Sequence, residues 1–212
     1  MTQATTTPTD MVDRWLAIYG APDANAAALL VDGHDPDAVT FTVIEVEASA
    51  DADSAPVPVT TDVTYGDLAE RSKRFASALA DLGVGRGDTV GVLMGKREEL
   101  VVSLLAIARL GAVYIPLFTA FATPAIEMRL RAGNAKVVIT EPSQASKLDG
   151  LEDIRTVVAG PEFEELVDSH DPIAESVAVG GEGTLILLFT SGTTGAPKGV
   201  PVPVKALASF VA

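Results

Sequence analysis

The sequence predicts an α/β fold in which a mostly parallel sheet is flanked by helices on both faces. Short apolar runs typical of buried strands recur along the chain, as at Thr89–Met94 and Leu185–Phe189. Segments with helical spacing of apolar residues separate them, and glycine-containing turns mark the boundaries. Strands that alternate with helices of this length favour parallel pairing with helical crossovers.

The composition suits a packed domain and excludes several functions. Hydrophobic residues make up 48% of the 212 residues and charged residues 21%, which argues against a disordered chain. The net charge of −14 repels nucleic-acid phosphates and anionic lipid, so we expect neither as a partner. No cysteine is present, which excludes disulfides, thiolate zinc sites and a thiol nucleophile.

The N-terminal quarter of the sequence is irregular. We expect a disordered tail over residues 1–9, with no secretory signal, and a cytoplasmic protein. Residues 10–62 are expected to hold one or two short helices with Trp15, Leu16 and Ile18 turned inward, then a strand over Val39–Val46. The polar, proline-containing residues 48–62 are expected to form a loop.

From Val63 the pattern becomes regular, and residues 63–212 are expected to form a partial α/β domain. Thr64 and Asp67 have the spacing of a helix-capping pair, and Gly83 and Gly111 are placed to end helices. Thr123 is expected to cap a further helix. The predicted helices are 67–82, 97–110, 123–132 and 161–169, and the predicted strands are 89–94, 113–115, 136–140, 156–159 and 185–189.

The apolar residues 100–117 resemble a membrane span in length only. Arg109, Gly111 and Pro116 interrupt the run, and four charged residues precede it. We therefore expect a buried helix followed by a short strand.

The segment TSGTTGAPKG, residues 190–199, combines features that phosphate binding requires. Its glycines allow sharp turns that bring backbone N–H groups close to an oxyanion, its hydroxyls add donors, and Lys198 adds a positive charge. The spacing is not that of a Walker P-loop, because Ala196 and Pro197 separate Gly195 from the lysine. A glycine-rich turn without function would not explain this concentration of donors.

FTSGTTGAPKGV resembles the phosphate-binding signature of the adenylate-forming (AMP-binding) superfamily, which includes acyl-CoA synthetases, peptide-synthetase adenylation domains and luciferases. VTYGDLAERSKRFASALADLGVGRGDTVGVLM and ELVVSLLAIARLGAVYIPLFTAF resemble the segments that precede it in these enzymes. The resemblance covers roughly residues 60–200, and PLFTAFATPAIEMRL is most similar to the acetyl- and medium-chain acyl-CoA synthetase branch.

The resemblance implies a ligase that activates a carboxylic acid with ATP to an acyl-adenylate and passes the acyl group to coenzyme A. Lys198 would stabilise charge in the transition state. The residues expected to hold the β- and γ-phosphates are Thr190, Ser191, Gly192, Thr193, Thr194, Gly195 and Lys198. Mg²⁺ is expected as a cofactor, with its ligands outside this chain, and no metal site is predicted within it.

The same resemblance implies that the chain is the N-terminal part of a longer enzyme. Family members are more than twice as long, and KALASFVA reads as a helix cut in mid-course. We expect the isolated chain to be inactive. The alternative is a truncated, non-catalytic protein that binds a phosphate or a partner through the same loop.

Three further groups of residues are weaker candidates. After PKGV many relatives carry a Thr/Ser-His pair, whereas this sequence has two prolines and then Lys205. His34 and His170 are expected to be solvated loop residues, because a single histidine does not make a metal site. Three aromatic residues are candidates for a substrate pocket, although core packing explains them nearly as well: Tyr114, Phe118 and Phe121.

Overall fold

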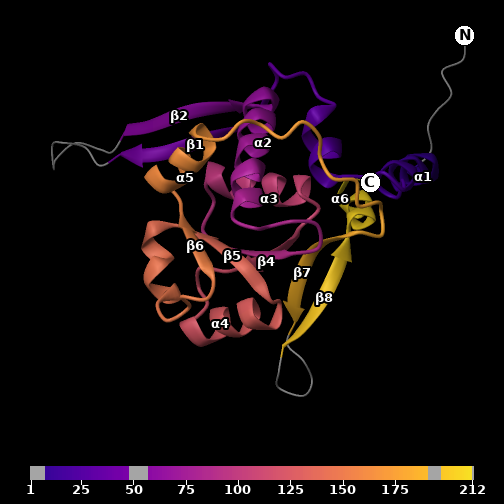
Figure 1. The fold of residues 1–212 in the computed structure, drawn as a ribbon. Coiled ribbons are helices and arrows are strands. Elements are labelled where there is room, and N and C mark those ends of the chain that lie inside the picture. Colours follow the sequence, from indigo (N-terminus) through magenta and orange to yellow (C-terminus); the bar gives the residue numbers. More distant parts are fainter. Residues whose placement is uncertain (1–7, 48–56, 191–196, 212) are drawn as a thin grey trace, which may run out of the picture.

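A computed structural model describes residues 8–47, 57–190 and 197–211 (Figure 1). The α-helices are α1 (Pro8–Tyr19), α2 (Tyr65–Asp81), α3 (Glu98–Arg109), α4 (Thr123–Ala132), α5 (Pro161–Asp168) and α6 (Ala208–Val211). The strands are β1 (Val39–Glu47), β2 (Val57–Thr64), β3 (Thr89–Leu93), β4 (Val113–Leu117), β5 (Ala135–Thr140), β6 (Arg155–Val158), β7 (Thr184–Thr190) and β8 (Lys198–Pro203). Three short helical turns complete the set: η1 (Ala28–Asp32), η2 (Pro142–Leu148) and η3 (Val204–Leu207).

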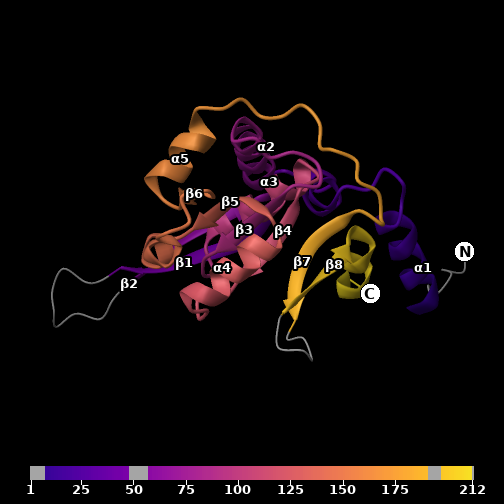
Figure 2. The ribbon, with the colours of Figure 1, turned by 60° about the horizontal axis from the view of Figure 1, so that its bottom comes forward.

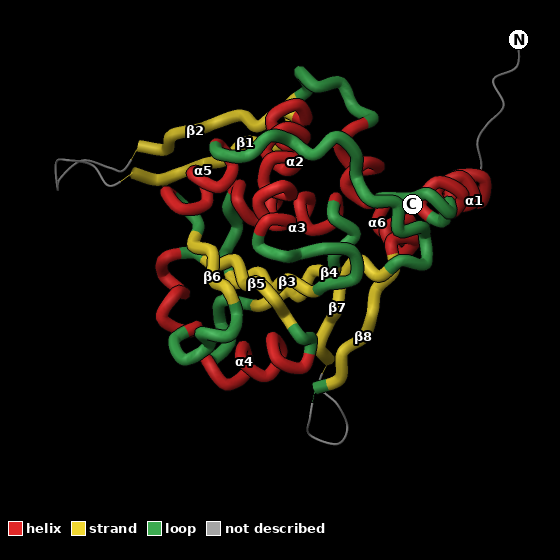
Figure 3. Tube along the Cα trace, in the orientation of Figure 1, coloured by secondary structure: helices red, strands yellow, loops and turns green. Residues whose placement is uncertain are grey.

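The main sheet has the strand order β6-β5-β3-β4-β7-β8 (Figure 3). Every neighbouring pair is parallel except β7 and β8, which run antiparallel. Strands β1 and β2 form a separate antiparallel hairpin. The mostly parallel sheet flanked by helices confirms the predicted fold class.

Two apolar cores lie on opposite faces of this sheet (Figure 2). Helices α2, α3 and α5 pack on one face, where Phe75 and Phe163 are fully buried. Helix α4 and the segment around η2 pack on the other, where Ile126 and Leu130 contact Val138 of β5. Residues on alternate positions of one strand point to opposite faces, so Val138 joins the second core while its neighbours join the first.

The start of α2 is fixed by the predicted capping pair. The Asp67 amide donates to the Thr64 hydroxyl oxygen at 3.1 Å, and the Thr64 amide donates to the Asp67 carboxylate at 3.0 Å. At the other end Gly83 has a φ of 84°, a conformation that glycine adopts without strain. Both signals were readable in the sequence, and the structure confirms both.

Replacing Thr64 with alanine is expected to cost about 1 kcal/mol of unfolding free energy at pH 7. Hydrogen bonds from the Thr64 side chain and backbone lower the pKa of Asp67. A carboxylate with a lowered folded-state pKa stabilises the fold above its unfolded pKa of about 4, and the contribution is lost as the pH falls through the folded pKa. Urea unfolding should therefore show that Thr64→Ala lowers the free energy of unfolding by less at pH 3 than at pH 7.

The matched control is Thr123→Ala. The prediction that Thr123 caps α4 is wrong: Ala122 occupies the cap position, Thr123 is the first residue of the helix, and no side chain caps it. We expect Thr123→Ala to change the free energy of unfolding by no more than about 0.5 kcal/mol. An equal cost for the two variants would contradict the role of the Thr64 side chain.

The predicted loop over 48–62 is wrong from residue 57 onward. Strand β2 pairs with β1 from Val57 to Thr64, with Pro58 opposite Val46. Proline lacks a backbone donor, but it is tolerated in a hairpin strand whose other side has no strand partner. Residues 48–56 of that prediction lie outside the described residues.

The N-terminal predictions are confirmed only in part. The expected tail over 1–9 is wrong at residues 8 and 9, because α1 begins at Pro8, and residues 1–7 lie outside the described residues. Trp15 and Ile18 are half-buried, whereas Leu16 is 47% exposed and does not turn inward. Tyr19, which the sequence did not single out, is the buried aromatic residue of this helix.

Over 8–47, 57–190 and 197–211, no helix is long and apolar enough to cross a bilayer. The apolar residues 100–117 form α3 and β4, as predicted. Arg109 does not reach solvent from this segment: it is completely buried.

Candidate functional site

The β7–β8 hairpin carries the glycine-rich segment at its tip. Thr190 ends β7 and lies opposite Lys198, which begins β8. Both side chains are exposed, so the hydroxyl and the ammonium group stand at the mouth of the loop. The other predicted phosphate-binding residues, Ser191 to Gly195, lie outside the described residues.

Strand β7 is less buried than its apolar sequence predicts. Its residues are half-buried or exposed, and Leu188 is 39% exposed. The reason is its position: it pairs with β4 through one residue pair, Tyr114 and Ile186. Leu187 and Phe189 pack against the second core without being enclosed by it.

Strand β7 ends at the edge of the sheet where ligands of α/β proteins bind. Because β7 runs parallel to β4, its last residue, Thr190, lies at the same edge as the residues that follow β3, β4 and β5. Here the Glu141 carboxylate accepts from the Gly95 amide at 2.9 Å, which joins the ends of β5 and β3. Burial raises the pKa of Glu141, but hydrogen bonds from Ser143, Gly95 and Gln144 outweigh it and leave the pKa below its ordinary value.

Lys147 fixes the chain that follows β4 at this edge. Its Nζ atom donates to the carbonyl oxygens of Thr119 and Phe121, at 2.5 and 3.1 Å. The Arg129 guanidinium lies 4.2 Å from the centre of the Phe121 ring, and Phe118 packs edge-on against the same ring. Sequence reasoning missed Glu141 and Lys147, since each bonds to backbone atoms more than twenty residues away.

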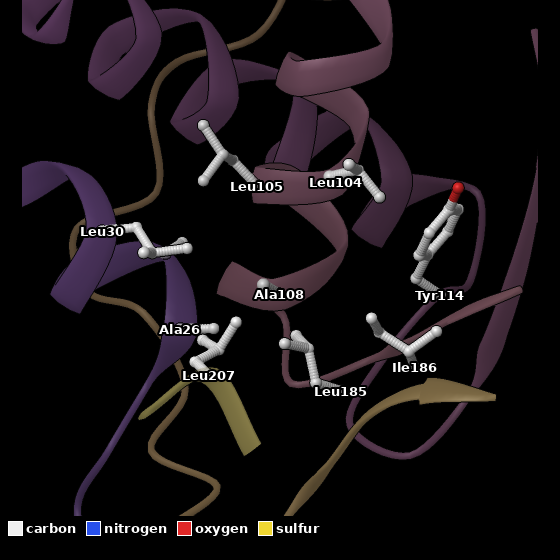
Figure 4. A pocket seen from close by; sticks show the side chains of 10 residues that line it. Ala26, Leu30, Leu104, Leu105, Ala108, Tyr114, Leu185, Ile186 and Leu207 are labelled. Atoms are coloured by element: carbon white, nitrogen blue, oxygen red, sulfur yellow. The ribbon is translucent and has the colours of Figure 1, made fainter. Parts of the chain in front are cut away.

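Of the three candidate pocket aromatics, Tyr114 lies apart from Phe118 and Phe121, which pack against each other. Phe121 packs against the second core, and Phe118 is 64% exposed. Tyr114 lines an apolar pocket of about 170 Å³ between α3, β7 and η3, where its hydroxyl is turned away from Leu207 (Figure 4). Burial raises the pKa of Tyr114 to about 12, so this pocket presents no charge at neutral pH and does not suit a phosphate.

Lys205 is placed away from the loop. It follows β8 at the base of the hairpin, where its ammonium group pairs with Glu182. Pro201 and Pro203 lie in β8, which is an edge strand of the sheet as predicted.

The two histidines lie apart from the hairpin tip. His170 Nδ1 lies 2.7 Å from the Leu166 carbonyl oxygen at the end of α5, and its Nε2 is 3.4 Å from Asp81. The His34 ring stacks on Tyr65 at 4.1 Å. In the part of the chain that the structure describes, no group of three or more histidine or acidic side chains is placed to hold a metal ion.

Comparisons with known proteins extend the resemblance seen in the sequence. The AMP-binding enzyme family matches residues 44–212. The crystal structure of an acyl-CoA synthetase from Brucella canis superposes with a TM-score of 0.80 at 32% identity, covering 97% of this chain and 40% of that protein. The crystal structure of the anthranilate CoA ligase AuaEII, in complex with anthranoyl-AMP, gives a TM-score of 0.63 at 28% identity, covering 68% of this chain and 29% of that one.

Curated relatives give the same result. 4-coumarate–CoA ligase 3 from Arabidopsis thaliana is 32% identical over 70% of this chain. Acetyl-coenzyme A synthetase 1 from Candida albicans is 32% identical over 89% of it. The chain spans only 28% of the length of either relative. Since the family match covers well over half of the sequence, the chain belongs to the AMP-binding enzyme family.

Proposed function

We propose that this chain forms part of an AMP-forming acid–thiol ligase. In the first step a substrate carboxylate attacks the α-phosphate of ATP, which forms an acyl-adenylate and releases pyrophosphate. In the second step the thiol of coenzyme A displaces AMP. The relatives named as acetyl-coenzyme A synthetase, CoA ligase and acyl-CoA synthetase support this reaction class and the choice of coenzyme A as acceptor.

The observation that carries the proposal is the pairing of Thr190 with Lys198 across the hairpin, at the edge of the sheet where ligands bind. This pairing brings the two ends of the glycine-rich segment together. By sequence, Ser191, Thr193 and Thr194 add hydroxyls, and Gly192 and Gly195 allow close approach of backbone amides. Donors and a cation of these kinds would stabilise charge on the leaving pyrophosphate.

Mg²⁺ would neutralise charge on the phosphates in such a reaction. Among the described residues, no group of three or more histidine or acidic side chains is placed to hold the ion. Its ligands remain an expectation for the rest of the protein.

The proposal is tested by ATP–pyrophosphate exchange with a panel of carboxylic acids. The complete protein that carries residues 1–212 is expected to catalyse exchange that depends on one class of acid. The 212-residue chain alone is expected to bind pyrophosphate without exchange, because it spans a minor part of its relatives. Binding without acid-dependent exchange in the complete protein would instead favour the non-catalytic, phosphate-binding alternative.

Replacing His170 with alanine is expected to leave the kcat/KM for adenylate formation within about twofold of the parent. The imidazole contacts α5 and α2, and neither its Nδ1 nor its Nε2 faces the hairpin tip. Steady-state kinetics with ATP varied would check this. A loss of more than tenfold would mean that the histidine takes part in adenylate formation.

A further inference from the structure

The segment of residues 173–183, here called the strap, links α5 to β7. It passes over α2 and α3 as an extended chain (Figure 2). Its backbone amides bond to other parts of the fold: Val177 to the Arg109 carbonyl oxygen at 2.7 Å, and Gly180 to that of Ala24 at 3.0 Å. The strap is therefore fixed by residues from α3 and from the N-terminal segment rather than by a sheet.

Arg109 is a completely buried side chain whose guanidinium group joins three elements to the strap. Nη1 and Nη2 donate to the Asp32 carboxylate at 2.9 and 2.7 Å, and Nε donates to the Ser72 hydroxyl at 2.8 Å. Nη1 also donates to the Ser176 hydroxyl of the strap at 3.0 Å. A planar guanidinium with several partners holds them in one geometry, because its N–H directions are fixed.

Asn25 also holds the strap, from the N-terminal segment. Its Nδ2 atom donates to the carbonyl oxygens of Ala108 and Val177, both at 2.8 Å. Its Oδ1 atom accepts from the amides of Ala27 and Ala28. The residue is 4% exposed, and its NH2 group ties the end of α3 to the strap while its oxygen bonds the N-terminal segment.

The end of the strap passes so close to the N-terminal segment that only glycine fits. A Cβ atom on Gly181 would lie 2.4 Å from the Gly20 Cα atom and 2.7 Å from the Tyr19 oxygen. The strap also binds the base of the hairpin, because the Val204 and Lys205 amides donate to the carbonyl oxygens of Gly183 and Gly181 at 2.9 Å.

The orientation of the hairpin depends on this base. Strand β3 pairs with β4 from Thr89 to Leu93, but β7 pairs with β4 only at Tyr114 and Ile186. One residue pair does not fix the angle of a strand as a full ladder does. We infer that Asn25 and Arg109 are positioning residues: by holding the strap they set where the hairpin presents Thr190 and Lys198. The catalytic part of this inference rests on the proposed function.

Asn25→Asp and Ser176→Ala in the complete protein test the inference. The first keeps the shape of the side chain but turns carboxylate oxygens toward two carbonyls, and the second removes one strap contact while leaving the Arg109–Asp32 pair. Ser77→Ala is the matched control, because its hydroxyl bonds to the Asp171 carbonyl oxygen, just before the strap.

Hydrogen exchange of the β7 and β8 amides is expected to become about tenfold faster in Asn25→Asp and about fivefold faster in Ser176→Ala. Exchange in β3 and β5 should stay unchanged, and Ser77→Ala should match the parent throughout. The KM for ATP in adenylate formation should rise by similar factors, with the KM for the acid unchanged.

The outcomes separate the inference from the proposed function. Unchanged exchange in β7 and β8, or equal acceleration in β3 and β5, would overturn the inference. Faster exchange confined to the hairpin with an unchanged KM for ATP would overturn its catalytic part and leave the proposed function intact. Faster hairpin exchange in a complete protein that has no acid-dependent activity would support the role of Asn25 and Arg109 in holding the hairpin and would reject the proposed function.

Discussion

Replacing Lys198 with alanine in the complete protein is expected to lower the kcat for adenylate formation by about 10²–10³-fold. Lys198 lies opposite Thr190 at the base of the glycine-rich segment and carries the positive charge of this segment. Negative charge on the departing pyrophosphate develops in the transition state, so losing the cation should affect kcat more than the binding of the carboxylate. Single-turnover formation of acyl-adenylate measures this step directly.

Two variants define what the lysine contributes. Lys205→Ala is the matched control, since Lys205 lies at the base of the same hairpin in an ion pair with Glu182, and we expect kinetics within about twofold of the parent. Lys198→Arg keeps the charge with a different shape and should recover part of the rate. If Lys198→Ala and the parent formed adenylate at the same rate, the role assigned to Lys198 would be wrong.

Phe75→Ala is expected to lower the free energy of unfolding by about 3–5 kcal/mol. The ring is completely buried in the first core, and its centre lies 4.2 Å from that of Phe163 in α5. Truncation leaves a cavity between α2 and α5 and removes an aromatic contact. Urea unfolding followed by circular dichroism would measure the change.

Phe210→Ala provides the control for that measurement. Phe210 is 80% exposed, so its truncation in the 212-residue chain should change the unfolding free energy by less than about 0.5 kcal/mol. Similar unfolding midpoints for the two phenylalanine variants would contradict the placement of Phe75 in the core.

Local signals in the sequence predicted much of the fold. Thr64 with Asp67, Gly83 and Gly111 act within a few residues of their position, so their roles could be inferred without the structure. Strand β2 was missed because its pairing with β1 outweighs the low strand propensity of Pro58. The exposure of Leu16 and Leu188 depends on which elements lie beside them, which local periodicity does not encode.

The candidate site, too, could be predicted from the sequence only in part. The loop residues could be recognised because they are consecutive, and the sequence placed them after a strand. The hydrogen bond between Glu141 and Gly95 could not be recognised from the sequence, because these residues are 46 positions apart. The same holds for the contacts of Arg109, which reach partners up to 77 positions away. In the sequence Arg109 only interrupts an apolar run. In the fold it is the buried centre of a polar network.

The two prolines of β8 have a consequence for self-association. The Val204 amide points toward the hairpin partner, and backbone groups alternate in direction along a strand, so Pro201 and Pro203 occupy positions whose amides would face outward. The outer side of β8 thus lacks two donors that an incoming strand from another molecule would need. This side of the sheet offers a poor template for intermolecular strand addition, which lowers the aggregation risk of an otherwise apolar hairpin.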